Sequence, residues 1–191
     1  MAELHDQGAC AALDLPLRVG SASLALIEAA PMLSIAPYRD GERRVADALA
    51  ERIGGGLPET GNSRALDGGG RIFWTGAGLW FLRGPAAADE ALSGALIDHA
   101  ALTDQGAAWT GLRLDGPAAA EVLARLAPVD LEGLPAGTTL RTGLRHVMCA
   151  LVVLADGYEI WVMRSFSLAA AHDIETAMRH VAGAAEIRNS S

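Results

Sequence analysis

Short apolar runs alternate with glycine-rich breaks and with stretches of helical period along the whole chain. Apolar runs bounded by glycine or proline are typical of strands, and apolar residues three and four positions apart are typical of one face of a helix. The clearest helical pattern follows Asp40, which we expect to cap the helix, and it stops at glycines 54–56. The first half is therefore predicted to contain strands at 24–27 and 32–38, a helix after Asp40, a hairpin of strands 72–75 and 79–82, and a helix from 85 to about 97.

The second half repeats this order of elements. It is predicted to contain a strand at 108–114, a helix opened by Asp115-Gly116-Pro117 and running through Leu126, strands at 140–144, 147–154 and 158–163, and a helix from 166 to about 182. In both halves a hairpin strand of aromatic and aliphatic residues ends in arginine, at Arg83 and at Arg164. The match indicates an ancient duplication, and two unrelated units of coincidentally similar order remain the alternative.

These elements predict an α+β fold of two similar βαββα-type subdomains with mixed or antiparallel sheets. We place an N-terminal arm and first strand at 1–29, with the arm itself over residues 1 to about 15. The first subdomain is then 30–100 and the second 101–191, together forming one globular unit.

Composition narrows the range of functions. The 191 residues carry a formal net charge of -8, so no nucleic-acid partner is expected. All 15 basic residues are arginine, which excludes a phosphate-loop lysine, a Schiff-base lysine and a Ser–Lys dyad. Two cysteines, Cys10 and Cys149, fit a reducing compartment. Acidic residues near the N-terminus contradict a signal peptide, and the longest apolar run, 147–155, is too short to cross a membrane, so we expect a cytoplasmic protein without a membrane partner.

No catalytic, cofactor or metal site is predicted in this chain. The glycine clusters match neither a dinucleotide loop nor a phosphate loop and are interpreted as turns. His172 and Glu175 share a helix face, but no third ligand has a suitable spacing for a metal. Ser165 and Ser167 flank Phe166 without forming a nucleophile elbow, and we expect them to cap the last helix.

Aromatic and arginine side chains are the remaining candidates, because these residue types anchor both cores and interfaces. Arg164 could also bind a carboxylate through two hydrogen bonds, although an ion pair within the chain or at an interface is the preferred interpretation. The candidates for structural or interface roles are Trp80, Arg83, Asp104, Trp161, Arg164 and Phe166.

Five segments, in order over roughly residues 30–182, resemble the gamma subunit of heterotetrameric sarcosine oxidase. Residues 72–82 resemble its I-L-W-L-G-P-D-E-W-L-L hairpin, and residues 159–167 resemble its closing E-L-W-V-x-R-S-F-A. The other segments are Leu57-Pro58 followed by Asn62, Asp104 through Gly116-Pro117-Ala118, and 127–131 with Gly137 and Thr142.

This resemblance implies the fold of the glycine-cleavage T-protein and of related folate-binding aminomethyltransferases. It also implies alpha, beta and delta subunits as partners, with FAD, FMN, NAD and tetrahydrofolate bound by those partners and no cofactor bound by this chain. Such a complex demethylates sarcosine oxidatively to glycine, forms peroxide and passes the one-carbon unit to folate.

Three departures from the related sequences bear on function. Ala77-Gly78 replaces the acidic pair of the hairpin turn, and Gly106 replaces the serine that follows Asp104. The run 145–150 lacks the catalytic carboxylate of the T-protein, so folate chemistry by this chain alone is not expected. The first hypothesis is a non-catalytic gamma-type subunit. The alternatives are a stand-alone tetrahydrofolate-binding aminomethyltransferase-like protein and a small-carboxylate-binding module that uses Arg83 or Arg164.

Overall fold

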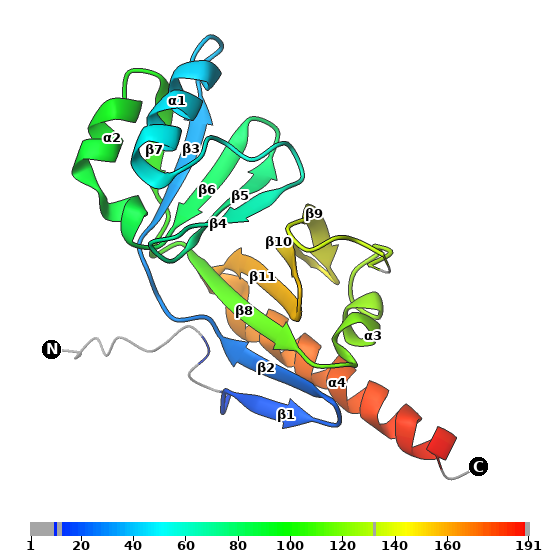
Figure 1. Ribbon diagram of the computed structural model, residues 1–191. Helices are drawn as coiled ribbons and strands as arrows, with labels where there is room; N and C mark the ends of the chain where they lie inside the picture. The colour runs from blue at the N-terminus through cyan, green and yellow to red at the C-terminus, as the bar shows by residue number, and fades with distance from the viewer. Residues whose placement is uncertain (1–9, 11–12, 132, 190–191) are drawn as a thin grey trace, which may run out of the picture. The chain divides into compact units, whose positions relative to one another are not determined.

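The structure is a computed structural model that describes residue 10 and residues 13–131 and 133–189. Its contacts divide the chain into two compact units (Figure 1). The central unit comprises residues 28–108 and 135–141, and the terminal unit comprises the described residues up to 27, 109–134 and those from 142 onward. The arm expected at residues 1 to about 15 lies mainly outside the described residues.

The units are interleaved along the chain, which differs from the boundaries drawn at 29/30 and 100/101. Strand β7 (Ala100–Asp104) pairs with β3 (Met32–Pro37) and so belongs to the central sheet. The N-terminal strand β2 (Ala22–Leu26) pairs with β8 (Trp109–Asp115) and so belongs to the terminal sheet. Strand pairing between segments far apart in sequence decides the boundaries.

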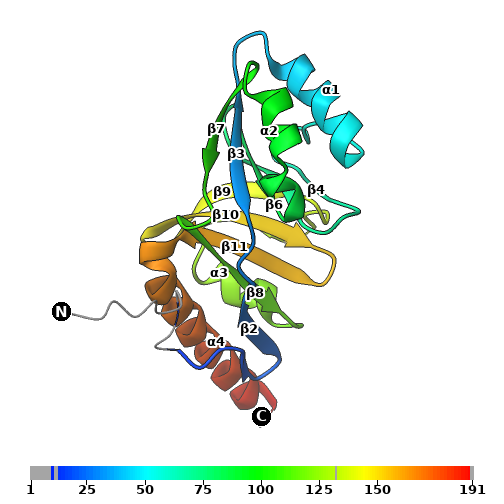
Figure 2. The same ribbon diagram turned by 90° about the vertical axis from the view of Figure 1, so that its left-hand side faces the viewer.

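The central unit has a five-stranded antiparallel sheet in the order β4-β5-β6-β3-β7. Its other strands are β4 (Ser63–Ala65), β5 (Arg71–Gly76) and β6 (Leu79–Arg83). Two helices, α1 (Glu42–Ile53) and α2 (Glu90–Leu96), lie side by side on one face of this sheet (Figure 2). Their apolar faces and the sheet form one core, whose fully buried members include Ile35, Val45, Leu49, Ile72, Leu82, Leu92 and Leu96.

Helix α1 stops where the sequence predicts but begins differently. Its N-cap is Gly41, with no side-chain cap bond, so the expected Asp40 cap is wrong. A Cβ at position 41 would lie 2.0 Å from the His99 carbonyl oxygen, so the turn that starts the helix requires glycine there. At the other end Gly54 has φ 71°, and its N–H donates to the Ala50 carbonyl at 3.2 Å.

The single helix expected from 85 to about 97 is two elements. A 3₁₀ turn, η1 (Pro85–Ala88), is followed by Asp89 with extended backbone at φ -75° and ψ 107°. The Asp89 carboxylate accepts the Ala91 N–H at 2.9 Å and starts α2. An aspartate that caps a helix cannot also be inside one, which is why the helix restarts here.

The terminal unit has a six-stranded antiparallel arrangement in the order β1-β2-β8-β11-β10-β9. The strands not yet given are β1 (Leu17–Val19), β9 (Thr139–Leu144), β10 (Val147–Leu154) and β11 (Gly157–Met163). The first residues of β9 have their contacts in the central unit. Helices α3 (Ala119–Ala124) and α4 (Ser167–Asn189) pack on one face, with a 3₁₀ turn η2 (Arg164–Phe166) before α4. The small side chains of Ala170, Ala171 and Ala177 are buried there and allow a close approach to the sheet.

Both helices of this unit differ in length from the prediction. Helix α3 begins at Ala119, after the Asp115-Gly116-Pro117 turn expected to open it, and ends at Ala124, two residues short of the expected Leu126. Gly116 has φ 99°, and a Cβ there would lie 2.2 Å from the Ser21 carbonyl oxygen, so this turn serves a close backbone approach. Helix α4 runs past 182 to Asn189, because Gly183 alone is too weak a break among good helix formers. No helix of the described residues is long and apolar enough to span a membrane.

The two units share one plan, as the repeat in the sequence predicts. Strands β3, β4, β5 and β6 have the same chain order as β8, β9, β10 and β11, and the spatial orders β4-β5-β6-β3 and β9-β10-β11-β8 are identical. In each unit the tryptophan of the hairpin strand pairs with a residue of the unit's first strand, Trp80 with Ile35 and Trp161 with Gly111.

Candidate functional site

Trp80 is a core residue whose indole N–H makes a hydrogen bond. Its side chain is 6% exposed and packs in the central core, and its indole N–H donates to the Pro58 carbonyl at 2.9 Å. This bond attaches the loop after α1 to β6. Trp80 also lines a groove between this loop and α1, together with Glu42 and Leu57.

Trp161, the matching residue of the terminal unit, is 4% exposed. Its ring lies against Gly111 on the neighbouring strand, where a Cβ would be 2.7 Å from two ring carbons. The indole N–H donates to the Glu159 carboxylate at 3.2 Å. Trp161 therefore has a packing role that depends on a glycine opposite it.

Arg83 and Asp104 lie at the same end of the central sheet, on either side of β3, where they pair with Met32 and Leu33. The Arg83 guanidinium donates to the carbonyl of Glu28. The Asp104 carboxylate accepts the Gly106 N–H at 2.8 Å in the turn after β7. Each side chain holds a segment that enters or leaves the sheet, so both have structural contacts of their own.

Arg164 and Phe166 form the corner between β11 and α4. The Ser167 hydroxyl, expected to cap the last helix, donates to the Arg164 carbonyl at 2.7 Å. Ser167 is completely buried, whereas Arg164 is exposed and Phe166 is 48% exposed. Other large apolar side chains exposed near this corner in the chain are Met163 and Leu168. We call Met163, Phe166 and Leu168 the apolar corner.

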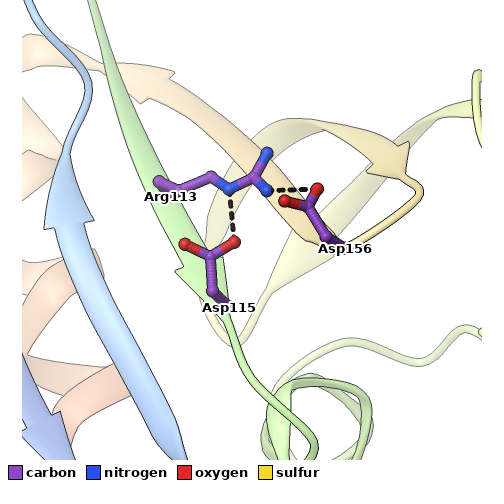
Figure 3. A network of polar contacts seen from close by, with 3 residues as sticks. All are labelled: Arg113, Asp115 and Asp156. Carbon is purple, nitrogen blue, oxygen red and sulfur yellow. Dashed lines mark hydrogen bonds and ion pairs between the residues drawn. The ribbon is translucent and has the colours of Figure 1, made fainter.

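The sequence analysis did not identify Arg113, whose side chain lies between two carboxylates (Figure 3). The Nε of Arg113 donates to Asp115 on the same strand, and an Nη donates to Asp156 in the β10–β11 turn at 2.6 Å. Burial opposes the charge on Arg113, but the hydrogen bonds to Asp156 and Asp115 outweigh it and raise the guanidinium pKa. The same hydrogen bond, with the charge of Arg113, lowers the pKa of Asp156. Both carboxylates are used by Arg113, so this cluster ties the turn to β8.

The remaining titratable candidates are also engaged or buried. On α4 the Glu175 carboxylate accepts from Arg179 at 2.6 Å, so Glu175 is paired one turn along rather than with His172. Cys10 and Cys149 are both buried, and burial raises the pKa of the Cys10 thiol while a hydrogen bond with Ser167 partly offsets the shift. Within the described residues, no three His, Cys, Asp or Glu side chains are grouped as metal ligands would be.

Solved structures of known proteins have a fold similar to that of this chain. No protein-family model and no curated protein matches this sequence. The chain is similar to heterotetrameric sarcosine oxidase from Corynebacterium sp. U-96 in complex with pyrrole 2-carboxylate, with a TM-score of 0.77 and 25% identity over 91% of this chain and 93% of that chain. It is also similar to the glycine cleavage system aminomethyltransferase T from Bartonella henselae, with a TM-score of 0.61 and 16% identity over 82% of this chain.

The second likeness shows the fold alone, and the match spans 46% of that aminomethyltransferase chain. Together the two likenesses confirm the resemblance and the α+β class predicted from the sequence. The chain has a sarcosine-oxidase-gamma-like fold of the T-protein type.

Proposed function

We propose that this chain is the gamma-type subunit of a sarcosine-oxidase-like heterotetramer and that it is not itself catalytic. The observation that supports this most is the likeness to heterotetrameric sarcosine oxidase, because it covers nearly all of both chains. The proposed partners are alpha, beta and delta subunits in the cytoplasm. In this proposal FAD, FMN, NAD and tetrahydrofolate are bound by those partners, which convert sarcosine to glycine with release of peroxide and formation of methylene-tetrahydrofolate.

The side chains of this chain support a non-catalytic part. The run 145–150, where the T-protein resemblance would place a carboxylate, contains none. Arg113 is matched by two carboxylates, and Asp104 is used in a turn. An arginine already matched in this way offers little to a substrate carboxylate, because binding would first have to break charge-assisted hydrogen bonds.

The apolar corner supports a place in an assembly. Met163, Phe166 and Leu168 are 49%, 48% and 43% exposed, although each is large enough to gain from burial. Apolar and aromatic residues with arginine nearby are typical of the buried centre of an interface. Arg164 lies within this corner, so the sequence-based interface candidates Arg164 and Phe166 lie next to one another there.

The experiment looks among the genomic neighbours for a flavin-dependent amine oxidase and a large T-protein-like chain, and co-expresses the tagged chain with them. We expect the tagged chain to retain both proteins through size-exclusion chromatography and the assembly to produce peroxide from sarcosine. We expect the chain purified alone to be colourless and to produce none. Bound flavin with turnover in the isolated chain would contradict the proposal.

Binding of tetrahydrofolate separates this proposal from the stand-alone aminomethyltransferase-like alternative. The likeness in fold to the aminomethyltransferase T is the reason to test that alternative. Calorimetry of the isolated chain with tetrahydrofolate should show no saturable heat. A saturable site would favour the alternative, whether or not the chain also assembles.

A further inference from the structure

Aspartate is followed directly by glycine at four places in the chain, at 40–41, 67–68, 115–116 and 156–157. In such a pair the backbone nitrogen of the glycine can attack the aspartate carboxyl carbon, because a glycine has no Cβ to obstruct the approach. The ring that forms is a succinimide. It requires that the peptide plane between the two residues can rotate and that the carboxyl group is not held elsewhere, so the structure decides which pair can react.

The Asp40-Gly41 pair is held by its backbone. The Gly41 N–H donates to the Tyr38 carbonyl at 2.8 Å. Gly41 is buried, and a Cβ there would lie 2.0 Å from the His99 carbonyl oxygen, so this segment is closely packed. Attack on Asp40 would have to break the hydrogen bond and move the backbone away from His99.

The pairs that begin at Asp115 and Asp156 are held by Arg113 (Figure 3). Its guanidinium donates to both carboxylates, with 2.6 Å between Nη2 and the Asp156 oxygen. The hydrogen bond from Arg113, together with its charge, lowers the pKa of Asp156 and keeps this carboxyl group ionised, and an ionised carboxylate is a poor electrophile. Asp115 also pairs with Ser23 on one side and Gly157 on the other, so the sheet fixes the backbone of both pairs.

The Asp67-Gly68 pair is held by none of these contacts. It occupies the two central positions of the turn between β4 and β5, which the Gly69 N–H closes by donating to the Leu66 carbonyl at 3.0 Å. Among the described residues, no hydrogen bond is made by the Asp67 carboxylate, the Asp67 carbonyl or the Gly68 N–H. Asp67 is exposed, and a Cβ at Gly68 would meet nothing within 4 Å. The peptide plane between them can therefore rotate.

Solvent reaches this pair from a hollow of about 490 Å³ beside the turn. Its lining includes Asp67, Gly68 and Gly69 of the turn, and Arg52 and Gly54 at the end of α1. All of these residues belong to the central unit. Water, which is released and then consumed when an aspartate rearranges through a succinimide, has direct access here.

We propose that Asp67 is a site of spontaneous modification, at which the folded chain converts its Asp67-Gly68 bond to an isoaspartyl bond. The Gly68 nitrogen bonds to Cγ of Asp67 and gives up its proton, while the carboxyl hydroxyl leaves as water. A second water molecule adds to the main-chain carbonyl carbon of Asp67 and breaks its bond to the Gly68 nitrogen, which regains a proton. The main chain then continues through Cγ, a free α-carboxylate remains, and the mass is unchanged. The modification is independent of the function proposed above.

The isoaspartyl bond lengthens the main chain by one atom inside a turn that is tightly packed on its other side. The Leu66 N–H donates to the Gly70 carbonyl at 3.2 Å, and a Cβ at Gly70 would lie 2.0 Å from the Arg83 carbonyl oxygen. The extra atom falls within the loop that this hydrogen bond closes. We therefore expect the melting temperature of the aged chain to fall in step with its isoaspartate content, and an unchanged melting temperature would overturn this effect on the turn.

The test follows isoaspartate in the purified full chain during incubation at physiological temperature. Trypsin cleaves after arginine and puts each Asp-Gly pair on a peptide of its own, namely 40–43, 65–71, 114–125 and 146–164. Electron-transfer fragmentation in a mass spectrometer distinguishes isoaspartyl from aspartyl peptides. Peptide 65–71 should contain isoaspartate at about tenfold or more above the other three, because the other pairs must first break hydrogen bonds. In urea, where no pair is held, isoaspartate should form in all four peptides.

Gly68→Ala is the matched variant, because its methyl group obstructs the attacking nitrogen but meets nothing within 4 Å in the fold. It should melt like the parent and lose isoaspartate in 65–71 severalfold. Asp67→Glu keeps the charge but would need a six-membered ring, so it should show none. Isoaspartate in the folded parent at another pair as fast as at Asp67, or none at Asp67 while the urea sample reacts, would overturn the proposal. This comparison within the parent decides the matter even if a variant fails to fold.

Discussion

Gly111 is a strand position where the packing leaves no room for a side chain. A Cβ added to this glycine would lie 2.7 Å from Cζ3 and Cη2 of Trp161 and 2.9 Å from Cδ1 of Ile27. Carbon atoms pack at about 3.5–4.0 Å, so Gly111→Ala requires the ring or the strand to move by more than half an ångström. The indole is 4% exposed and bonded to Glu159, so it has little room to give way.

Overpacking a tight core by one methyl group costs about 1–3 kcal/mol. For a chain of this size 1 kcal/mol shifts the melting temperature by about 2–4 °C, so a loss of about 2 kcal/mol lowers it by roughly 4–8 °C. The assay is a thermal melt followed by circular dichroism on the free chain. Gly143→Ala is the matched control, because Gly143 is also a strand glycine but its added Cβ would meet nothing closer than 3.6 Å.

Trp161→Phe supplies the second arm, because phenylalanine lacks the outer ring atoms that the new methyl group strikes. In the Trp161→Phe background, Gly111→Ala should cost clearly less than it does in the parent. The reasoning is refuted if Gly111→Ala melts like the parent, or if its cost is the same in both backgrounds.

Three other contacts give predictions of their own. The Arg64 guanidinium donates to the carbonyls of Ile53 and Gly56, each at 3.3 Å, and to the carbonyl of Gly55. Arg64→Met should therefore lower the melting temperature by about 2–4 °C. An unchanged melting temperature would show that water replaces these hydrogen bonds without loss of stability. Because Arg113 lowers the folded pKa of Asp156, this carboxylate stabilises the fold above its unfolded pKa of about 4, and the contribution is lost as the pH falls through the folded pKa. The melting-temperature difference between the parent and Asp156→Asn should therefore shrink on acidification, and a difference that grows would contradict the assignment. Phe166→Ser should leave the melting temperature of the free chain unchanged but reduce retention of partner proteins, whereas an unchanged yield of assembly would remove the apolar corner from the interface.

The sequence pattern identified the strands that lie inside the sheets and missed three of the four at the edges, all but β9. Strands β10 and β11 are read almost to the residue, because each has neighbours on both sides and carries a continuous apolar run. The three strands that were missed, β1, β4 and β7, each end a sheet and are only partly buried. An edge strand with a solvent-exposed face needs few apolar residues, so its pattern of apolar and polar positions is weak.

The polar contacts could not be predicted from the pattern of apolar and polar positions, for another reason. Arg113 and Asp115 share a strand face and could have been paired from their spacing, but Asp156 is 43 positions from Arg113 in the sequence. It comes close because β11 pairs with β8 and sets Gly157 opposite Asp115. Such a contact depends on the register of two strands, and the register is known only once the sheet is built.

The matching tryptophans show why the resemblance reports a fold more firmly than a site. Both occupy corresponding positions in the hairpin strand next to the first strand of their unit, yet Trp80 faces Ile35 and Trp161 faces Gly111. The two indole N–H groups have also diverged, one donating to the carbonyl of a loop residue, Pro58, and the other to the carboxylate of Glu159 on its own strand. The tryptophan thus keeps its place in the sheet of each unit while its polar contacts differ, which indicates shared packing and not shared chemistry. The same reasoning applies to the motifs that resemble the sarcosine oxidase gamma subunit, so the proposed role in a complex is best tested on the surface, where Phe166 and its apolar neighbours are exposed.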